Sequence, residues 1–569
     1  MSTSARRLQR SDERESSPDP LDIIPRESTS GRLITPPPAT ESEGRIVSFT
    51  NTPRALKPIK YHTQQIKQDA NNMGLWDSMT ESSLQSVVSP EVFFQKYLPP
   101  TLAENPETIR RIVKEAAPAL AQANVTLEPH IKRYENKEGR DENVMSEPFI
   151  TYGNVVLVAS GAGAYLKDTH RTKLPTLKPH PPNHTSPDFL SRLLGTDNKK
   201  LSWYITDLTG ELKWDIDIIT DEGTLSESEK AVAARAQLCK SARNLLMALG
   251  RCHVYVLTIF AIRYARIFRF DRAGFIATTK FNWLEHDIDI FPRFFFRVHN
   301  PSTSLRMDGL DDTITFPEDD TVAKLWKALS RHPYYSKTLD EKTVTNHCLR
   351  IAAARRVGDP LSYEQELVHC LTVGEILSVS DGLFGRATRV YRVIIEEDLD
   401  KDGPPAVYAL KDVWRQACRR PEADFYDLIE HHCETAEPRI DMDAIGMARC
   451  RGSIDLSDAT SPLFDKTWDP ALHKTRFGVD NERQRLHTRT LLTPVGSSIE
   501  NFPSTKRVIE ALLNVSIHLK IAYDAGIIHR DVSVGNILFV EDTSAESSVA
   551  GFLVDWDYAE VDKRRCQTI

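Results

Sequence analysis

The chain has 569 residues, which is too long for a single compact core, so several domains are expected. Its formal net charge of −8 argues against a dedicated nucleic-acid binder, because affinity for phosphate backbones depends on clustered cations. The eight cysteines show no CxxC pair and no regular spacing, which indicates reduced intracellular thiols and argues against a disulfide framework or a zinc module.

Residues 1–70 are rich in Ser, Pro, Thr, Arg and Glu. We expect a disordered tail here, because such a segment cannot bury enough apolar surface to offset the entropy of ordering it. The start of the chain lacks the apolar segment of a secretory signal. The longest apolar run, residues 253–265, contains Arg263 and is too short to cross a bilayer. These features predict a cytoplasmic or nuclear protein without a membrane partner.

Residues 71–370 are expected to form a helical and α+β extension. Helical spacing of apolar residues begins at about Met73 and predicts helices over residues 89–99, 106–123 and 228–249. Short strands are expected at VVLVAS (155–160) and WYITDL (203–208), and two or three antiparallel strands over residues 253–280. The turn DRAG, residues 271–274, lies between these strands, and its Asp and Arg are expected to form the turn.

From about residue 371 the pattern changes. Two strands with a glycine-containing turn are expected in ILSVSDGLFGRATRVYRVII, followed by a strand in VYALKDVW and a short helix in PEADFYDLIEHH. A loop-rich stretch of roughly fifty residues then leads to the strand TRTLLTPVG and a helix over residues 504–526, with Gly526 as its C-cap.

The stretch HRDVSVGN, residues 529–536, lies between two aliphatic runs. It matches H-R-D-x-x-x-x-N, the catalytic loop of protein kinases, in which the Asp acts as base and the Asn binds magnesium. Asp531 and Asn536 are therefore candidates for these roles, with Arg530 as the arginine of the motif. A polar loop between two apolar segments is the structural alternative.

Three further elements follow the order of a kinase. The strand in GFLVDWDYA delivers Asp555 where kinases keep the Asp of D-F-G, which binds magnesium. Lys411 ends YALK and fits the strand lysine that contacts the phosphates. Glu422 opens the next helix and is the best candidate to pair with Lys411, with Glu430 as the fallback; a helix-terminal acid favoured by the macrodipole is the alternative.

The phosphate-binding loop departs most from its pattern. Aligned backwards from Val390, the three glycine positions hold Leu383, Gly385 and Thr388, although Gly382 lies beside them. The segment GRAT between two strands would still bring backbone amides over phosphates.

The segments LFGRATRVY, ALKDVW, HRDVSVGNIL and FLVDWDYA together resemble the fungal-type protein kinases, and DRAGFIATTKF resembles that family's N-terminal extension. The similarity covers approximately residues 180–565. It implies an ATP- and Mg²⁺-dependent serine/threonine protein kinase acting on a protein substrate. In that case Asp531 is the base, Asn536 and Asp555 hold magnesium, and Lys411 contacts ATP. Ser533 in place of the usual catalytic-loop lysine matches the family and removes one cation.

The expected fold class is α+β: a protein-kinase-like fold with a five-stranded antiparallel N-lobe (371–500) and the start of an α-helical C-lobe (501–569). Only 12 residues follow Asp557, so we expect an incomplete C-lobe and weak activity. Two other functions remain open. One is a pseudokinase-like scaffold, and the other a small-molecule phosphotransferase of the choline or aminoglycoside kinase type.

Metal binding elsewhere has one crowded candidate, His431, His432 and Cys433, with Cys418 and Cys450 nearby. Adjacent ligands at irregular spacing are poor metal geometry, so no metal is expected there.

Overall fold

The computed structural model describes residues 83–101, 104–175, 184–193, 201–300, 308–345, 348–380, 382–475, 483–541 and 549–562. The predicted disordered tail, residues 1–70, lies outside the described residues. Among the helices that the structure describes, none has the combination of length and apolar character that a membrane crossing requires. The mixture of helices and sheets confirms the predicted α+β class.

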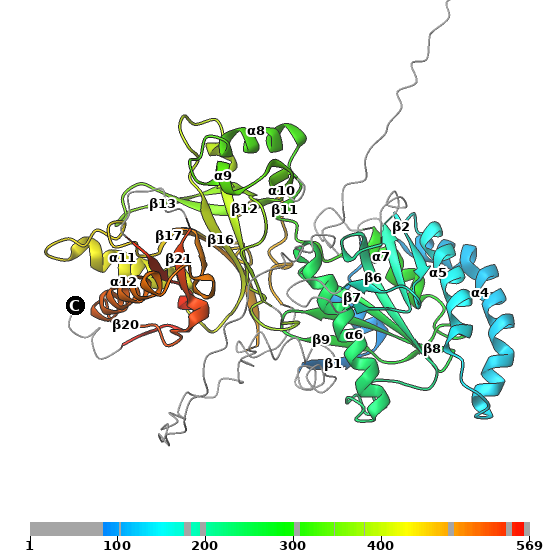
Figure 1. Cartoon of the computed structure of the whole chain (residues 1–569). Helices are drawn as coiled ribbons and strands as arrows, with labels where there is room; N and C mark the ends of the chain where they lie inside the picture. The colour runs from blue at the N-terminus through cyan, green and yellow to red at the C-terminus, as the bar shows by residue number, and fades with distance from the viewer. Residues whose placement is uncertain are drawn as a thin grey trace, which may run out of the picture.

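The extension is built on an eight-stranded sheet in the order β1-β9-β8-β7-β6-β5-β2, with β10 paired to β8 (Figure 1). Pairs β1–β9 and β6–β7 are parallel and the others antiparallel. Its strands are β1 (Leu84–Val88), β2 (Ala164–Asp168), β5 (Phe189–Leu193), β6 (Thr206–Lys213), β7 (His253–Phe260), β8 (Tyr264–Asp271), β9 (Phe275–Thr278) and β10 (Phe281–Asn282); β3 (Leu174–Pro175) and β4 (His184–Thr185) form a separate pair.

Helices cover both faces of this sheet. They are α3 (Pro90–Tyr97), α4 (Pro106–Glu135), α5 (Ser146–Ala159), α6 (Glu229–Met247) and α7 (Ile290–His299). Along β7, Tyr255 and Leu257 pack with α4, α5 and α7, whereas Val254 and Val256 pack with α6 on the opposite face. Because successive side chains of a strand point to opposite faces, a sheet buried on both sides requires the continuous apolar run seen in the sequence.

One predicted strand of the extension is wrong, and another begins later than predicted. Residues 155–160, predicted as a strand, lie at the end of α5, where Tyr152, Val156 and Ala159 are buried at helical spacing. The β-branched run was misleading because tertiary burial of one helix face overrides local propensity. In WYITDL, residues 203–205 form a 3₁₀ turn, and the strand begins only at Thr206. Helical structure was also expected from about Met73; residues 73–82 lie outside the described residues, and the first described element is the strand β1.

The second large sheet has the order β11-β12-β13-β15-β16-β18-β17, with β14 paired to β15. Its strands are β11 (Ile314–Thr315), β12 (Arg350–Val357), β13 (Glu364–Thr372), β14 (Ser378–Val379), β15 (Arg389–Ile395), β16 (Tyr408–Gln416), β17 (Arg449–Asp455) and β18 (Arg485–Thr493). The pairs are all antiparallel. Strand β17 falls inside the predicted fifty-residue loop, and the predicted boundary at residue 371 falls inside this sheet.

The sheet curls until β12 lies against β17. A Cβ added at Gly452 of β17 would sit 2.0 Å from the carbonyl oxygen of Ala354 in β12, so the backbones touch. The enclosed apolar residues come from strands all along the sheet: Ile351, Ala353, Val368, Cys370, Val393, Ile395, Leu410 and Leu491. The curl therefore gives this sheet an apolar interior of its own.

The remaining elements pack beside this sheet. They are α8 (Asp319–Leu329), α9 (Tyr335–Thr338), α10 (Glu341–Thr345), α11 (Glu422–Thr435), α12 (Thr505–Asp524), and the short strands β19 (Gly496–Ser498), β20 (Ile527–Ile528), β21 (Ile537–Val540), β22 (Gly551–Leu553) and β23 (Glu560–Val561). Ser504 caps α12, and Gly526 follows its end with φ +77°, as its predicted C-cap role requires.

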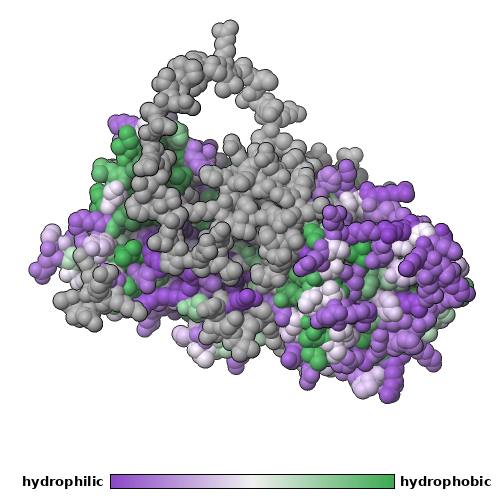
Figure 2. All heavy atoms as spheres, turned by 90° about the horizontal axis from the view of Figure 1, so that it is seen from below, coloured by the Kyte–Doolittle hydropathy of each residue, from purple (hydrophilic) through white to green (hydrophobic). Residues whose placement is uncertain are grey.

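One face of α12 is apolar and exposed. Ile509, Leu512, Leu513 and Ile517 are all exposed on this helix. Figure 2 shows hydrophobic residues at the described surface both on the left, the side on which α12 lies in Figure 1, and on the right. An apolar helix face of this kind is normally buried against a neighbouring layer.

Candidate active site

The loop HRDVSVGN runs from β20 into β21 and is fixed by its first residue. His529 is buried, donates from Nε2 to the carbonyl of Val554 at 3.1 Å, and accepts at Nδ1 from the backbone N–H of Asp531 at 3.3 Å. Its ring packs on Trp556, with centroids 4.5 Å apart. Burial lowers the pKa of His529, which favours the neutral ring that these two hydrogen bonds need.

Asp531 and Asn536 lie side by side at the surface of this loop. The amide of Asn536 donates to the backbone carbonyl of Asp531 at 2.8 Å and to its carboxylate at 3.3 Å. Since Nδ2 is used in this way, Oδ1 is the amide atom that remains to bind a ligand. Arg530 has φ +66° and points elsewhere: it is exposed and pairs with Glu560 at 2.5 Å.

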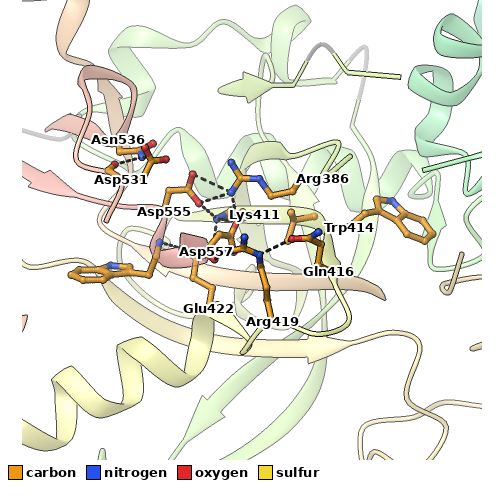
Figure 3. A network of polar contacts seen from close by, with 12 residues as sticks. Arg386, Lys411, Trp414, Gln416, Arg419, Glu422, Asp531, Asn536, Asp555 and Asp557 are labelled. Atoms are coloured by element: carbon orange, nitrogen blue, oxygen red, sulfur yellow. Dashed lines mark hydrogen bonds and ion pairs between the residues drawn. The ribbon is translucent and has the colours of Figure 1, made fainter. Parts of the chain in front are cut away.

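Asp555 comes from the end of β22 and is joined to the same loop. The backbone N–H of Val554 donates to the carbonyl of Asn536 at 3.0 Å, which holds the two loops together. Asp555 itself has φ +68° and ψ +69°, a left-handed conformation that is uncommon for a residue with a Cβ. This turn aims its carboxylate toward β16 (Figure 3).

Lys411 of β16 is buried at the centre of three carboxylates. Its Nζ lies 2.5 Å from Glu422 at the start of α11, 2.8 Å from Asp555 and 3.1 Å from Asp557. Burial alone would lower the pKa of Lys411, but the surrounding carboxylates outweigh it and raise the pKa above its usual range. Lys411 is therefore firmly charged. The fallback partner, Glu430, instead contacts Arg356 and Arg449.

The pKa values of two of these carboxylates, Glu422 and Asp555, are shifted in opposite directions. Burial raises the pKa of Glu422, and repulsion from Asp557 and Asp555 raises it further. Together these effects outweigh the attraction of Lys411, which lowers the pKa. At Asp555 burial is outweighed by Lys411 and Arg386, which hold its pKa below the usual range. The site thus contains one carboxylate that is easy to protonate and one that stays ionised.

The sequence interpretation did not include two members of this network, Arg386 and Asp557, among the site residues. Arg386 reaches over from the predicted phosphate loop and contacts Asp557 at 2.6 Å and Asp555 at 3.2 Å (Figure 3). Its guanidinium also lies 5.0 Å from the ring of Tyr558. The signal in the sequence was a pair of opposite charges, the Arg in GRAT and the second Asp in DWD.

The predicted phosphate loop is anchored on the extension. Leu383 is fully buried in the core between α6 and the first sheet, and Phe384 stacks on two phenylalanines of β8 and β9. The backbone N–H of Gly385 donates to the carbonyl of Arg272 at 2.9 Å. Gly385 has φ +117° with open space where a Cβ would be, so conformation is what favours glycine here.

The last two predicted loop residues continue into the sheet. The carbonyl of Thr388 accepts from Ser380 at 2.8 Å, and Val390 pairs with Lys411 across β15 and β16. Val390 also packs against the core below α11 and α12. The structure thus brings Lys411 and Asp555 into direct contact, whereas Thr388 takes part through its backbone and Val390 through strand pairing and packing.

Oxygen atoms of Glu422, Asp555 and Asp557 all lie within 4.8 Å of one another. Carboxylate oxygens are the ligands that hard cations such as Mg²⁺ prefer. The ammonium of Lys411 lies 2.5, 2.8 and 3.1 Å from these three carboxylates, so in this arrangement it is the cation among them. The two groups of candidate metal ligands found in the described residues do not include His431 or Cys433.

Comparison with known proteins adds the family. The family model described as "Fungal protein kinase" matches residues 209–567, which is more than half of the chain. A search among curated proteins finds no significant match. The match overlaps most of the segment in which the sequence resembles fungal-type kinases, so this resemblance is confirmed, and the chain belongs to the fungal protein kinase family.

Proposed function

We propose that the protein is an ATP-dependent serine/threonine protein kinase. The observation that carries this proposal is the buried Lys411, held at 2.5 Å by Glu422 and at 2.8 Å by Asp555. A lysine fixed in this way by the helix that follows its strand is what a kinase needs to orient the non-transferred phosphates. The strand order β14–β15–β16–β18–β17 further supports assigning a five-stranded kinase N-lobe within the larger sheet.

The metal-binding part of the proposal rests on Asn536 and Asp555. An amide oxygen and an ionised carboxylate, on loops joined through the Val554 hydrogen bond, form a suitable pair of magnesium ligands. When bound, magnesium neutralises charge on the phosphates. Asp557, whose oxygen lies close to that of Asp555, adds a further carboxylate.

Asp531 is proposed as the base. Its carboxylate is partly exposed beside Asn536 and positioned by His529, so an acceptor hydroxyl can approach it and give up its proton. Gly385, Thr388 and Val390 would border the nucleotide, with the backbone of the loop over the phosphates. Ser533 supplies no cation, and Arg386 brings a second one from the loop. Arg530 pairs with Glu560 and supports the segment after Asp555.

A non-catalytic scaffold is the second candidate, and one observation favours it. Arg386 and Lys411 together engage both oxygens of Asp555, so cations already satisfy the carboxylate that should bind magnesium. Nucleotide binding requires Arg386 to exchange this carboxylate for phosphate. A protein in which Arg386 keeps its ion pairs would not transfer phosphate.

The test is magnesium-ATP binding and phosphotransfer by the purified 569-residue chain, with generic proteins and amino alcohols as acceptors. We expect Asp531→Asn to keep nucleotide binding and to lower phosphotransfer by roughly 10²–10⁴-fold, the usual contribution of a positioned base. Asp524→Asn, on the exposed end of α12 and paired with Lys520, is the matched control and should behave as wild type.

Each other outcome has a meaning. Binding without transfer by the wild-type chain would establish the scaffold. Transfer to amino alcohols alone would establish a small-molecule phosphotransferase. Equal transfer by wild type and Asp531→Asn would refute the assignment of the base.

A further inference from the structure

A second cluster of chemically active side chains lies away from the kinase site, where the extension meets the curled sheet. It contains Cys252 before β7, Asp311 before β11, His473 in the loop before β18, and His487 within β18. All four residues are buried, and one ligand atom from each lies within 4.8 Å of the others. Four potential metal ligands from four distant segments thus meet at one point.

The hydrogen bonds of His473 and His487 indicate that a cation lies between their rings. Nε2 of His473 bonds a carboxylate oxygen of Asp312 at 2.8 Å, and Nε2 of His487 bonds Asp412. Ionised carboxylates only accept hydrogen bonds, so both Nε2 atoms carry the hydrogen. In neutral rings both Nδ1 atoms are then lone-pair acceptors, yet they face each other at 2.9 Å. Only a cation between them, a metal ion or a shared proton, relieves this contact.

We infer that this cluster is a structural zinc site with the ligands Cys252 Sγ, His473 Nδ1, His487 Nδ1 and a carboxylate oxygen of Asp311. Four protein ligands of the N, S and O type in a closed, buried position are characteristic of structural zinc. At bond lengths of about 2.0–2.3 Å, tetrahedral ligand atoms stand roughly 3.3–3.6 Å apart, so the two nitrogens separate slightly and the other ligands move inward.

The surroundings of the cluster match those of zinc in the hydrogen bonds that its two histidines make. Histidines that bind zinc usually donate their other nitrogen to a carboxylate, and here Asp312 and Asp412 both fill that role.

The position of the site explains what the metal would do. Asp412 follows Lys411 in β16, and successive residues of a strand point to opposite faces, so one faces the kinase site and the other the zinc site. The ring of Trp414 on the same strand stacks on His487, with centroids 4.5 Å apart. The ion would tie the extension to β16 and β18 and so fix the strand that carries Lys411.

The test is metal analysis of the full-length chain, followed by titration of the metal-free protein with zinc and with cobalt. We expect stoichiometric zinc, a thiolate-to-cobalt charge-transfer band, and a lower melting temperature after chelation. Cys252→Ala should abolish the band and weaken metal binding by more than the roughly 10–100-fold that loss of an outer-shell partner costs. Cys370→Ala is the control, because Cys370 is equally buried but lies inside the curled sheet.

Asp312→Asn provides a milder variant in case Cys252→Ala fails to fold, and it should weaken zinc binding by about 10–100-fold while keeping the cobalt band. A wild-type chain that contains no zinc and shows no thiolate band with cobalt would overturn the inference, and the histidine pair would then share a proton. Equal metal affinity in Cys252→Ala and Cys370→Ala would overturn it as well.

Discussion

Lys411 and Glu422 form one ion pair, but the structure predicts very different consequences for removing each partner. Lys411 contacts three carboxylates, at 2.5, 2.8 and 3.1 Å. Lys411→Met would leave these carboxylates buried, and Arg386 would still contact two of them, Asp555 and Asp557. Breaking a buried pair in this way leaves uncompensated charge, so we expect the free energy of unfolding to fall by about 3–5 kcal/mol.

Glu422→Gln removes one attraction to Lys411 and at the same time two repulsions, from Asp555 and Asp557. The lost hydrogen bond costs about 1 kcal/mol, and the relief of repulsion offsets part of this. We therefore expect a loss of about 1 kcal/mol or less. In the double variant, Glu422→Gln removes one of the stranded carboxylates, so the double variant should be more stable than Lys411→Met alone.

Urea unfolding at neutral pH, followed by tryptophan fluorescence, measures these differences, since Trp556 packs directly beside the site. Lys411→Arg serves as the control that keeps the charge. The reasoning is refuted if Lys411→Met and Glu422→Gln destabilise equally, or if their effects add in the double variant.

Three further predictions concern packing, pH and the loop. Gly452→Ala places a Cβ 2.0 Å from the carbonyl of Ala354, so we expect a loss of about 1–3 kcal/mol or more in urea unfolding, whereas Gly163→Ala, with open space around it, should cost less than about 1 kcal/mol. Burial lowers the pKa of His518, so the folded chain resists a proton that the unfolded chain accepts below the usual histidine value of 6.5. This contribution to the free energy of unfolding is therefore present above pH 6.5 and is lost as the pH falls below it, by up to about 1.4 kcal/mol per pH unit. His518→Gln should flatten the dependence of the free energy of unfolding on pH, and an unchanged slope would contradict the prediction. Phe384→Ala removes ring stacking worth about 1 kcal/mol, so hydrogen exchange of the Gly385 amide should become roughly 5-fold faster. An unchanged exchange rate would show that the ring does not anchor the loop.

Local signals in the sequence predicted the helices best. Ser504 before an amphipathic run and Gly526 after it marked both ends of α12, because caps are properties of neighbouring residues. The same reasoning failed at residues 155–160 and missed β17, whose burial depends on the contact between Gly452 and Ala354 far away in the sequence.

For the candidate site, the sequence alone indicated the chemistry: the spacing in HRDVSVGN and the order of Lys411, Glu422 and Asp555 follow a known catalytic pattern, and the family match agrees with it. The tertiary structure decided which charges meet. Arg386 reaches Asp555 because the loop that carries it is anchored on the extension. Cys252 and His487 lie in one cluster because two sheets pack together. Spacing along a chain records local geometry, whereas contacts between distant segments arise only when burial of apolar faces brings those segments together.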